Sequence, residues 1–330
     1  MPKGILERLS EGPVLGDGGY LLELEKRGYV QAGPFTPEVV VEHPDALAEL
    51  HREFLRAGAE VLQTMTFYAS DDKLATVGME GTVDEINRNA VRIAREVASE
   101  GDALVAGNLS LTWAYDPSDP DHVRKLFDRQ LQDQIDAGPP DFWIGETFSY
   151  LGEALLFVER ARATGRPVMV TMSFETLPAK AYEGDAAGEA AKKLADAGAD
   201  IVGVNCLNGP AQQLPIAAEM VKAVGGAVPI AAQPVAYATT EREPDFTSGA
   251  AFPYALTPIT LARGDLADFA VKARDVGVRY IGSCCGSVAE HVRAMAKVLG
   301  KLPDREREWR SPTGKAMSAY EYHEHTETEV

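Results

Sequence analysis

Cysteine is scarce in this sequence, with 3 residues among 330. An odd number of thiols cannot be fully paired within one chain, and Cys284 and Cys285 are adjacent. The sequence therefore lacks a disulfide framework and is typical of a reducing compartment, where thiol or metal chemistry is favoured. The first residues also lack the apolar core of a signal peptide, so we expect a cytoplasmic protein.

Long apolar runs and an excess of positive charge are also missing. No run approaches the roughly 18 residues that a membrane span needs. Lys and Arg total 32 against 50 Asp and Glu, which gives a formal net charge of −18. Such an acidic surface repels nucleic acid and anionic membranes, so we expect neither as a partner.

What the sequence does contain is a regular alternation of apolar and amphipathic segments. The apolar runs, which we predict to be buried parallel strands, span 13–17, 60–64, 103–107, 141–146, 167–172, 200–205, 229–233 and 279–283. The predicted helices between them span 44–57, 83–98, 121–137, 151–164, 187–197, 211–224, 260–275 and 288–299. Several end close to a glycine that suits a left-handed helix end, at positions 58, 165, 198 and 277.

Repeated βα units of this length predict an α/β fold of the (β/α)8 TIM barrel type, a single domain over residues 1–300. A doubly wound open sheet is the alternative. Residues 301–330 differ, since they are rich in charge and carry Trp309, Tyr320, Tyr322, His323 and His325. We interpret them as a C-terminal tail, either an oligomerisation arm of a homo-oligomer or an exposed terminus.

Polar residues recur where the predicted strands end. They are Asp17, Thr64, Asn108, Glu146, Ser173, Asn205, Gln233 and the three cysteines. In a barrel of this type the reactive groups gather on the face that carries the C-terminal strand ends. Core packing does not explain so many polar strand ends, and the pattern predicts a functional site at this face.

The cysteines carry the sharpest signal. Cys206 ends the sixth predicted strand, and Cys284 and Cys285 end the eighth. One strand separates the two positions, so all three sulfurs can converge, and Gly282 and Gly286 allow the chain to turn around the pair. Three thiolates with one open position predict a catalytic Zn²⁺ site, because structural zinc sites usually have four protein ligands. The alternative is that the cysteines pack as small hydrophobes.

The predicted ligand set also indicates a type of reaction. A free thiol has a pKa near ~8.5, so coordination to zinc is needed to deliver a thiolate at neutral pH. Three cysteinates leave the zinc a weak Lewis acid, and a sulfur bound to it stays electron-rich. This favours alkyl transfer to a substrate thiol over hydrolysis by an activated water.

Four segments together carry a family resemblance: GDGGYLLELEKRGYVQAGPFTPE from residue 16, GAEVLQTMTFYASDDKL at 58–74, GVNC at 203–206 and GSCCG at 282–286. Over about residues 10–300 the chain resembles the zinc-dependent homocysteine S-methyltransferase family, in particular its betaine-dependent members. The resemblance implies a TIM barrel with Zn²⁺ on Cys206, Cys284 and Cys285. It implies methyl transfer from glycine betaine to homocysteine, giving methionine and dimethylglycine. S-methylmethionine, dimethylsulfoniopropionate or another betaine is the alternative onium donor.

The same resemblance implies that Asp17, Gly18, Thr64 and Glu146 bind homocysteine. Carboxylates suit its ammonium group, and backbone amides at the start of a helix suit its carboxylate. The alternatives are that Asp17 caps the following helix and that Glu146 forms a buried salt bridge. We expect Asn205 to orient the loop of Cys206.

The methyl donor is expected to meet aromatic rings, because quaternary ammonium binds to ring faces. The candidates are Phe35, Phe67, Tyr68, Phe148 and Tyr254. The resemblance places Tyr68 near the zinc, and we hypothesise that its oxygen fills the fourth position without homocysteine. Phe35 and Thr147 stand where the family pattern has tryptophan and tyrosine, and Trp113 and Tyr115 are the candidate replacements. Rim packing of Phe67 and Tyr68 and a non-catalytic zinc-storage barrel are the competing interpretations.

Overall fold

Parallel strands arranged around a common centre form the frame of the molecule. The computed structural model describes residues 3–31, 33 and 35–302, so the predicted tail falls almost wholly outside the described residues. The strands are β1 (Val14–Leu15), β2 (Val61–Gln63), β3 (Leu104–Ser110), β4 (Phe142–Phe148), β5 (Val168–Met172), β6 (Ile201–Asn205), β7 (Ile230–Gln233) and β8 (Val278–Ile281). Each predicted strand is confirmed.

The order of the strands closes a barrel. It is β1-β8-β7-β6-β5-β4-β3-β2, with every pairing parallel. At the seam between β1 and β2, the N–H of Glu60 donates to the carbonyl of Leu15 over 2.8 Å. The predicted (β/α)8 barrel is therefore correct, and the open sheet is excluded.

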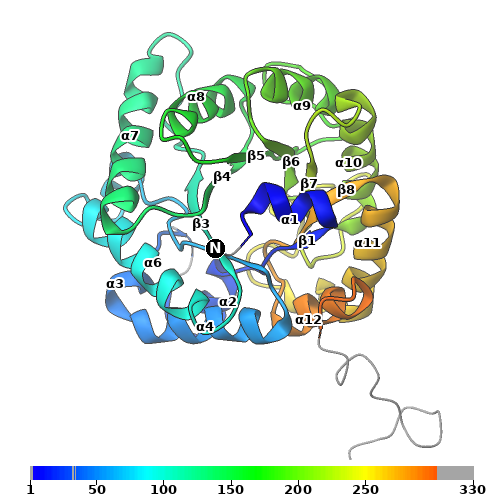
Figure 1. Cartoon of the computed structure of the whole chain (residues 1–330), viewed down its shortest axis with the longest axis horizontal. Coiled ribbons are helices and arrows are strands. Elements are labelled where there is room, and N and C mark those ends of the chain that lie inside the picture. Colours follow the sequence, from blue (N-terminus) through cyan, green and yellow to red (C-terminus); the bar gives the residue numbers. More distant parts are fainter. Residues whose placement is uncertain (1–2, 32, 34, 303–330) are drawn as a thin grey trace, which may run out of the picture.

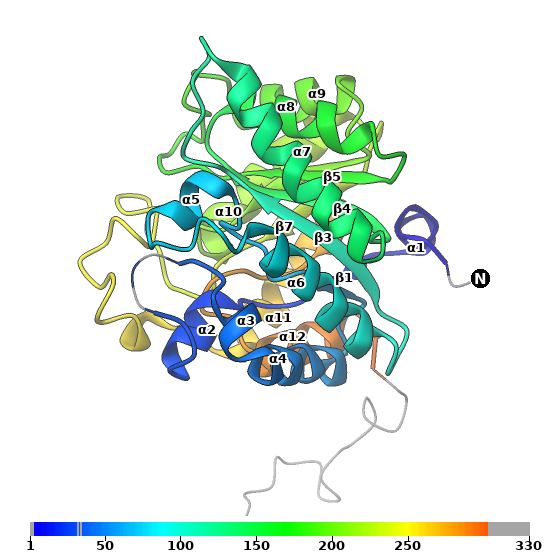
Figure 2. The same ribbon diagram turned by 90° about the vertical axis from the view of Figure 1, so that its left-hand side faces the viewer.

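Long helices form the outer ring (Figures 1 and 2). They are α4 (Pro44–Ala57), α6 (Val83–Ala98), α7 (Pro120–Ala137), α8 (Leu151–Arg162), α9 (Ala187–Asp196), α10 (Pro210–Val224), α11 (Arg263–Val276) and α12 (Ala289–Val298). The short helices α2 (Leu21–Lys26), α3 (Val39–Glu42) and α5 (Asp71–Ala75) lie in the connections that follow β1 and β2. The predicted helices correspond to α4 and α6–α12, with ends shifted by three residues at most. Gly58, Gly165, Gly198 and Gly277 all have positive φ, as expected of glycines at helix ends.

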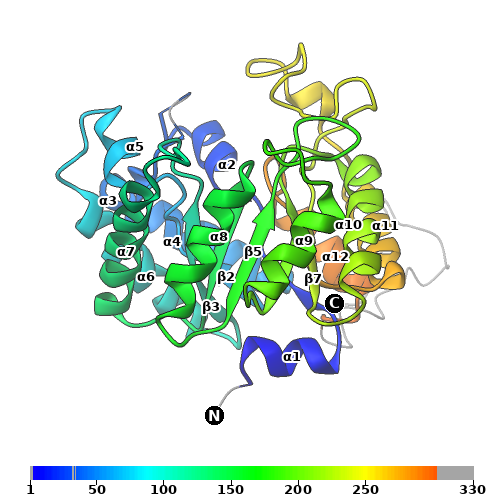
Figure 3. The same ribbon diagram turned by 90° about the horizontal axis from the view of Figure 1, so that it is seen from above.

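A helix that the periodicity did not predict, α1 (Ile5–Glu11), closes the N-terminal end of the barrel. Figure 3 shows it lying across this end, on the side away from the long loops. Ile5 and Leu9 are buried against the residues that fill the barrel interior, among them Phe142 and Tyr280. Because this end is plugged, access to the interior is confined to the C-terminal face.

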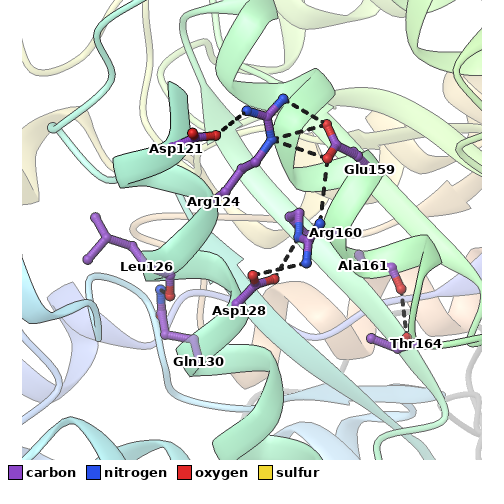
Figure 4. A network of polar contacts seen from close by, with 9 residues as sticks. All are labelled: Asp121, Arg124, Leu126, Asp128, Gln130, Glu159, Arg160, Ala161 and Thr164. Atoms are coloured by element: carbon purple, nitrogen blue, oxygen red, sulfur yellow. Dashed lines mark hydrogen bonds and ion pairs between the residues drawn. The ribbon is translucent and has the colours of Figure 1, made fainter. Parts of the chain in front are cut away.

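Exposed ion pairs tie neighbouring helices of the ring together. Figure 4 shows such a network between α7 and α8, in which Arg124 binds Asp121 and Glu159, and Arg160 binds Asp128. Exposed pairs of this kind contribute up to about 1 kcal/mol each. Burial of the core therefore contributes most of the stability. None of the helices within the described part of the chain is long and apolar enough to cross a membrane.

The plugging role of α1 gives a stability prediction. We expect Leu9→Ala to lower the free energy of unfolding by about 2–5 kcal/mol, because a buried leucine leaves a cavity when it is truncated. Leu6 is the matched control, since it lies on the same helix but is 42% exposed, and Leu6→Ala should change stability by about 0.5 kcal/mol or less. Urea denaturation measures both variants. Equal effects would show that α1 does not plug the barrel.

Candidate active site

The three cysteines come together at the C-terminal end of the barrel, as the sequence predicts. Their Sγ atoms all lie within 4.8 Å of one another. The sulfurs of Cys206 and Cys285 are 3.7 Å apart, which is far beyond a disulfide bond, and all three cysteines are free. The cluster can therefore offer three sulfur ligands to one metal ion.

Backbone hydrogen bonds through β7 hold the cluster. The N–H of Cys206 donates to the carbonyl of Gln233 (2.9 Å), and the N–H of Cys284 donates to the carbonyl of Pro234 (2.8 Å). Gly19 permits a further close approach, because a Cβ at this position would lie 2.7 Å from the carbonyl oxygen of Cys284. The sulfurs are thus positioned by three neighbouring strands and by the turn after β1.

The thiols share their protons unequally. Hydrogen bonds from Cys284 and Cys285 lower the pKa of Cys206 well below its usual value. The same contacts with Cys206 raise the pKa of Cys284 and Cys285. The three thiols are therefore electrostatically linked, and the contacts among them favour ionisation at Cys206 over Cys284 and Cys285.

A cavity of about 80 Å³ lies beside the cluster. It is lined by the three cysteines and by Gly18, Gly19, Tyr20, Leu21, Gln63, Thr64, Met65, Phe67, Asn108, Glu146, Thr147, Gln233 and Ser283. Most of the polar strand ends predicted to meet at one face therefore do meet. Asp17, Ser173 and Asn205 do not line the cavity, but they contact residues that do.

Glu146 supplies the carboxylate of this cavity. A shift of register between β4 and β5 falls at Gly145–Phe148, a bulge that re-aims the strand end. Glu146 accepts hydrogen bonds from Asn108 Nδ2 (2.7 Å) and Asn205 Nδ2 (3.1 Å). No cation pairs with Glu146 within the described part of the chain. Burial therefore raises the pKa of Glu146 to about 8.

Asn205 holds the end of β4 in place. Its Oδ1 accepts from the N–H of Thr147 and the hydroxyl of Thr171, both at 2.8 Å. Its Nδ2 donates to Glu146 and to the Thr147 hydroxyl. Thr147 needs this support, because its φ of +66° is unfavourable for a β-branched residue. These four hydrogen bonds go to β4 and β5, so the Asn205 side chain orients Glu146, whereas none of them reaches the loop of Cys206 that we expected it to orient.

Asp17 is fully buried below the cavity. Its Oδ2 accepts from the Tyr20 hydroxyl (2.6 Å) and the Gln63 N–H (2.7 Å), and its Oδ1 accepts from Gln63 Nε2 (3.1 Å). Burial raises its pKa to about 6, although these donors oppose the rise. The helix after β1 starts at Leu21 without a side-chain cap, so Asp17 does not act as the N-cap.

Thr64, Gly18 and Gly19 line the cavity wall. The Thr64 hydroxyl accepts from the N–H of Asn108 (2.8 Å) and lies 2.9 Å from the hydroxyl of Thr66, so it also joins β2 to β3. The N–H of Gly19 donates to the Ser287 carbonyl over 3.2 Å. At Gly18 a Cβ would approach the Phe54 ring to 2.6 Å, which requires glycine there.

The candidate aromatic residues do not form one cage. Phe67 lines the cavity and lies 4.2 Å from the ring of Tyr68, centroid to centroid. Phe35 lines a separate cavity with Tyr254, and Phe148 is buried in the core. The structure therefore brings only Phe67 and Tyr68 of the five close to the thiols.

Tyr68 has two partners on its outer side. The indole N–H of Trp113 donates to its hydroxyl over 2.7 Å, and the Lys73 ammonium lies 4.3 Å from its ring centroid. Burial raises the pKa of Tyr68, and the nearby charges of Cys206 and Cys285 add to the rise. Trp113 is thus joined to the site, whereas Tyr115 contacts the ring of Tyr150 instead.

Sequence reasoning missed three residues of the site. Gln63 and Tyr20 hold Asp17, and Tyr237 packs with Cys206 in a small apolar cluster. An amide inside the apolar run 60–64 was the available signal for Gln63. The long segment between β7 and α11 was the signal for Tyr237, since long ordered connections are often functional.

The four hydrogen bonds of Asn205 give a second stability prediction. Asn205→Leu keeps the volume but leaves the buried Thr147 N–H without its acceptor, so unfolding free energy should fall by about 1–3 kcal/mol or more. Thr171→Val removes one of these bonds and should have a smaller effect in the same urea titration. If Thr171→Val lowered the unfolding free energy as much as Asn205→Leu does, the hydrogen bonds of Asn205 to Thr147 would not be its main contribution to stability.

Comparison with known proteins gives three relatives of different kinds. A betaine–homocysteine S-methyltransferase 1 from Bos taurus is 44% identical over 92% of this chain and 76% of its own length. An S-methylmethionine–homocysteine S-methyltransferase from Pongo abelii is 42% identical over 92% of this chain and 82% of its own. The metallated form of the homocysteine methyltransferase MmuM from Escherichia coli shares the fold, with a TM-score of 0.67 at 22% identity over 86% of this chain and 95% of that one.

A family model adds coverage of almost the whole barrel. The model described as homocysteine S-methyltransferase matches residues 14–299, from the first residue of β1 to just beyond α12. The matched range includes all three cysteines and Glu146. This chain belongs to the homocysteine S-methyltransferase family.

Proposed function

We propose that this protein transfers a methyl group from glycine betaine to homocysteine with the help of Zn²⁺, forming methionine and dimethylglycine. The observation that carries the proposal is the convergence of three thiols beside a cavity whose wall holds Glu146. The relatives that are 44–45% identical and named for this reaction support betaine as the donor. The relative named for S-methylmethionine keeps that donor as the second candidate.

The spacing of the thiols supports zinc as the metal. Tetrahedral ligands at a Zn–S distance of about 2.3 Å lie about 3.8 Å apart, close to the 3.7 Å between Cys206 and Cys285. Cys206, Cys284 and Cys285 would hold the ion. When bound, zinc would supply the activation of the incoming thiol as a thiolate at neutral pH. Free thiols of this kind suit a reducing setting, and we infer a cytoplasmic protein.

The protein's own residues position the acceptor. We assign the ammonium group of homocysteine to Glu146, whose carboxylate faces the cavity without a cationic partner in the described structure. We assign the carboxylate of homocysteine to the backbone amides of the turn at Gly18. Asp17 acts in this scheme through Gln63, which it holds with two hydrogen bonds, and Thr64 completes the wall.

The donor enters from the side of the aromatic residues. The faces of Phe67 and Tyr68 suit its quaternary ammonium group. In the reaction the homocysteine sulfur attacks the methyl carbon, a C–S bond forms, and the methyl–nitrogen bond breaks with its electron pair left on nitrogen. Alignment of the two substrates contributes much of the rate. We propose that the Tyr68 hydroxyl would help the three cysteines to hold the ion when homocysteine is absent, and the hydrogen bond from Trp113 keeps this hydroxyl in place.

The donor is tested by product analysis. Zinc-loaded protein is incubated with homocysteine and, separately, betaine, dimethylsulfoniopropionate or S-methylmethionine, and methionine is quantified. We expect betaine to give the highest kcat/KM. If S-methylmethionine were the only compound that gave methionine, it would replace betaine as the proposed donor. If none of the three compounds gave methionine, the proposed function would be overturned.

The metal site is tested by single substitutions. Cys206→Ala, Cys284→Ala and Cys285→Ala should each abolish stoichiometric zinc binding and lower kcat/KM by at least about 1,000-fold, because the thiolates are the ligands. Ser287→Ala is the control, since it lies in the same turn and offers no sulfur. Zinc content by elemental analysis and far-UV circular dichroism are measured together. Full zinc content in any folded cysteine variant contradicts the assignment.

A further inference from the structure

Two buried amide oxygens at the cavity have no hydrogen-bond donor within the described part of the chain. They are Oδ1 of Asn108 and Oε1 of Gln233. Both residues line the cavity, and each is 1% exposed. Buried polar atoms of folded proteins nearly always have partners, so two orphaned acceptors at one cavity point to a ligand that donates hydrogen bonds.

The orientation of the Asn108 amide is fixed by its neighbours. Its Nδ2 donates to Gln63 Oε1 (2.9 Å) and to Glu146 Oε1 (2.7 Å). Because both partners are acceptors here, the nitrogen must face them, and the oxygen is the atom left over. Asn108 therefore supports the Glu146 carboxylate and adds an acceptor next to it.

Gln233 lies on the thiol side of the same cavity. It ends β7, between the strands that lead to Cys206 and Cys284, and its backbone carbonyl accepts from the N–H of Cys206. Gly282 leaves room for its side chain, because a Cβ at that position would lie 3.1 Å from the Gln233 Cγ. Gln233 therefore lines the cavity next to the strand ends that carry the thiols, and Glu146 lines the same cavity.

We propose that the amide oxygens of Asn108 and Gln233 join the Glu146 carboxylate in binding the α-ammonium group of the substrate thiol. The inference rests on the proposed function and extends it to acceptor specificity. Three acceptors match the three N–H donors of a primary ammonium group. A thiol without this group leaves all three unpaired in a buried site, which is a strong means of rejection. The substrate's carboxylate is repelled from this wall by the same oxygens.

The test compares homocysteine with 4-mercaptobutanoic acid, which keeps the thiol and carboxylate but lacks the ammonium group. Binding to zinc-loaded protein is measured by calorimetry without a donor, and kcat/KM is measured with betaine. Gln233→Met removes the amide at similar length and should weaken homocysteine binding about 10- to 100-fold, as expected for a hydrogen bond to a charged group. Binding of 4-mercaptobutanoic acid should change by less than about threefold.

Two further variants separate recognition from structure. Gln233→Glu retains an acceptor oxygen and should restore most of the preference for homocysteine. Gln130→Met is the matched control, because Gln130 is a buried glutamine on α7 that donates to the Leu126 carbonyl, outside the cavity (Figure 4). It should leave both ligands unaffected, and zinc content should remain stoichiometric in all three variants.

Asn108→Leu tests the second oxygen. It should reduce homocysteine binding at least as much as Gln233→Met, with little effect on 4-mercaptobutanoic acid. Equal losses for both thiols, or no loss for homocysteine, in the Gln233→Met or Asn108→Leu variant would overturn the inference. Failure of the proposed function looks different, since the native protein would then form no methionine whatever its thiol preference.

Discussion

The site depends on one constraint, the anchoring of three sulfurs by the backbone of adjacent strands. Cys206 and Cys284 both donate their N–H groups to carbonyls at the end of β7, at Gln233 and Pro234. The carbonyl of Cys285 accepts from Ala236 in the same segment. Main-chain bonds of this kind fix ligand positions more firmly than long side chains do, because few torsions remain free. A metal bound here would meet ligands that are already arranged, so little ordering entropy opposes its binding.

Backbone strain is concentrated around the same site. In the part of the chain that the structure describes, six residues other than glycine have positive φ: Phe35, Tyr68, Trp113, Thr147, Cys206 and Leu207. Thr147 lies near the end of β4 and the others lie in the connections after strands, and Thr147 and Cys206 line the cavity. Such conformations persist only where surrounding contacts impose them. At Thr147 these contacts are the hydrogen bonds of Asn205, and at Cys206 they are the bond to Gln233 and the neighbouring sulfurs. The barrel core supplies the stability that offsets this strain.

The sequence predicted the barrel well, because buried parallel strands are nearly continuous apolar runs. The glycines after several helices also indicate where a helix ends and the next strand begins. The sequence also predicted the convergence of the cysteines, since neighbouring strands of a closed barrel bring their ends together whatever the loops do. The contacts of individual side chains could not be predicted from the sequence. That Asp17 contacts Tyr20 and Gln63, or that Phe35 lies in a different cavity from Phe67, depends on loop conformation and rotamers. Helix α1 was missed because its 7 residues are too few to show a clear amphipathic periodicity.

The electrostatics of the cavity explain why cations belong in it. One carboxylate, three thiols and two amide oxygens without a donor line it, the Asp17 carboxylate is bound to Gln63 in its wall, and no Lys or Arg among the described residues lines it. Burial, together with the nearby charges of Cys206 and Asp17, raises the pKa of Glu146 to about 8, and burial raises the pKa of Asp17 to about 6, so negative charge at this site is disfavoured in the absence of a cation. A divalent metal and an ammonium group reverse that balance, because each opposite charge nearby favours the ionised forms of the thiols and of Glu146. Binding of a metal here and binding of the amino-acid thiol would therefore favour each other. An onium donor approaching this field is attracted by it, and it loses its charge on transfer, so the product that leaves is held less strongly than the donor that arrived.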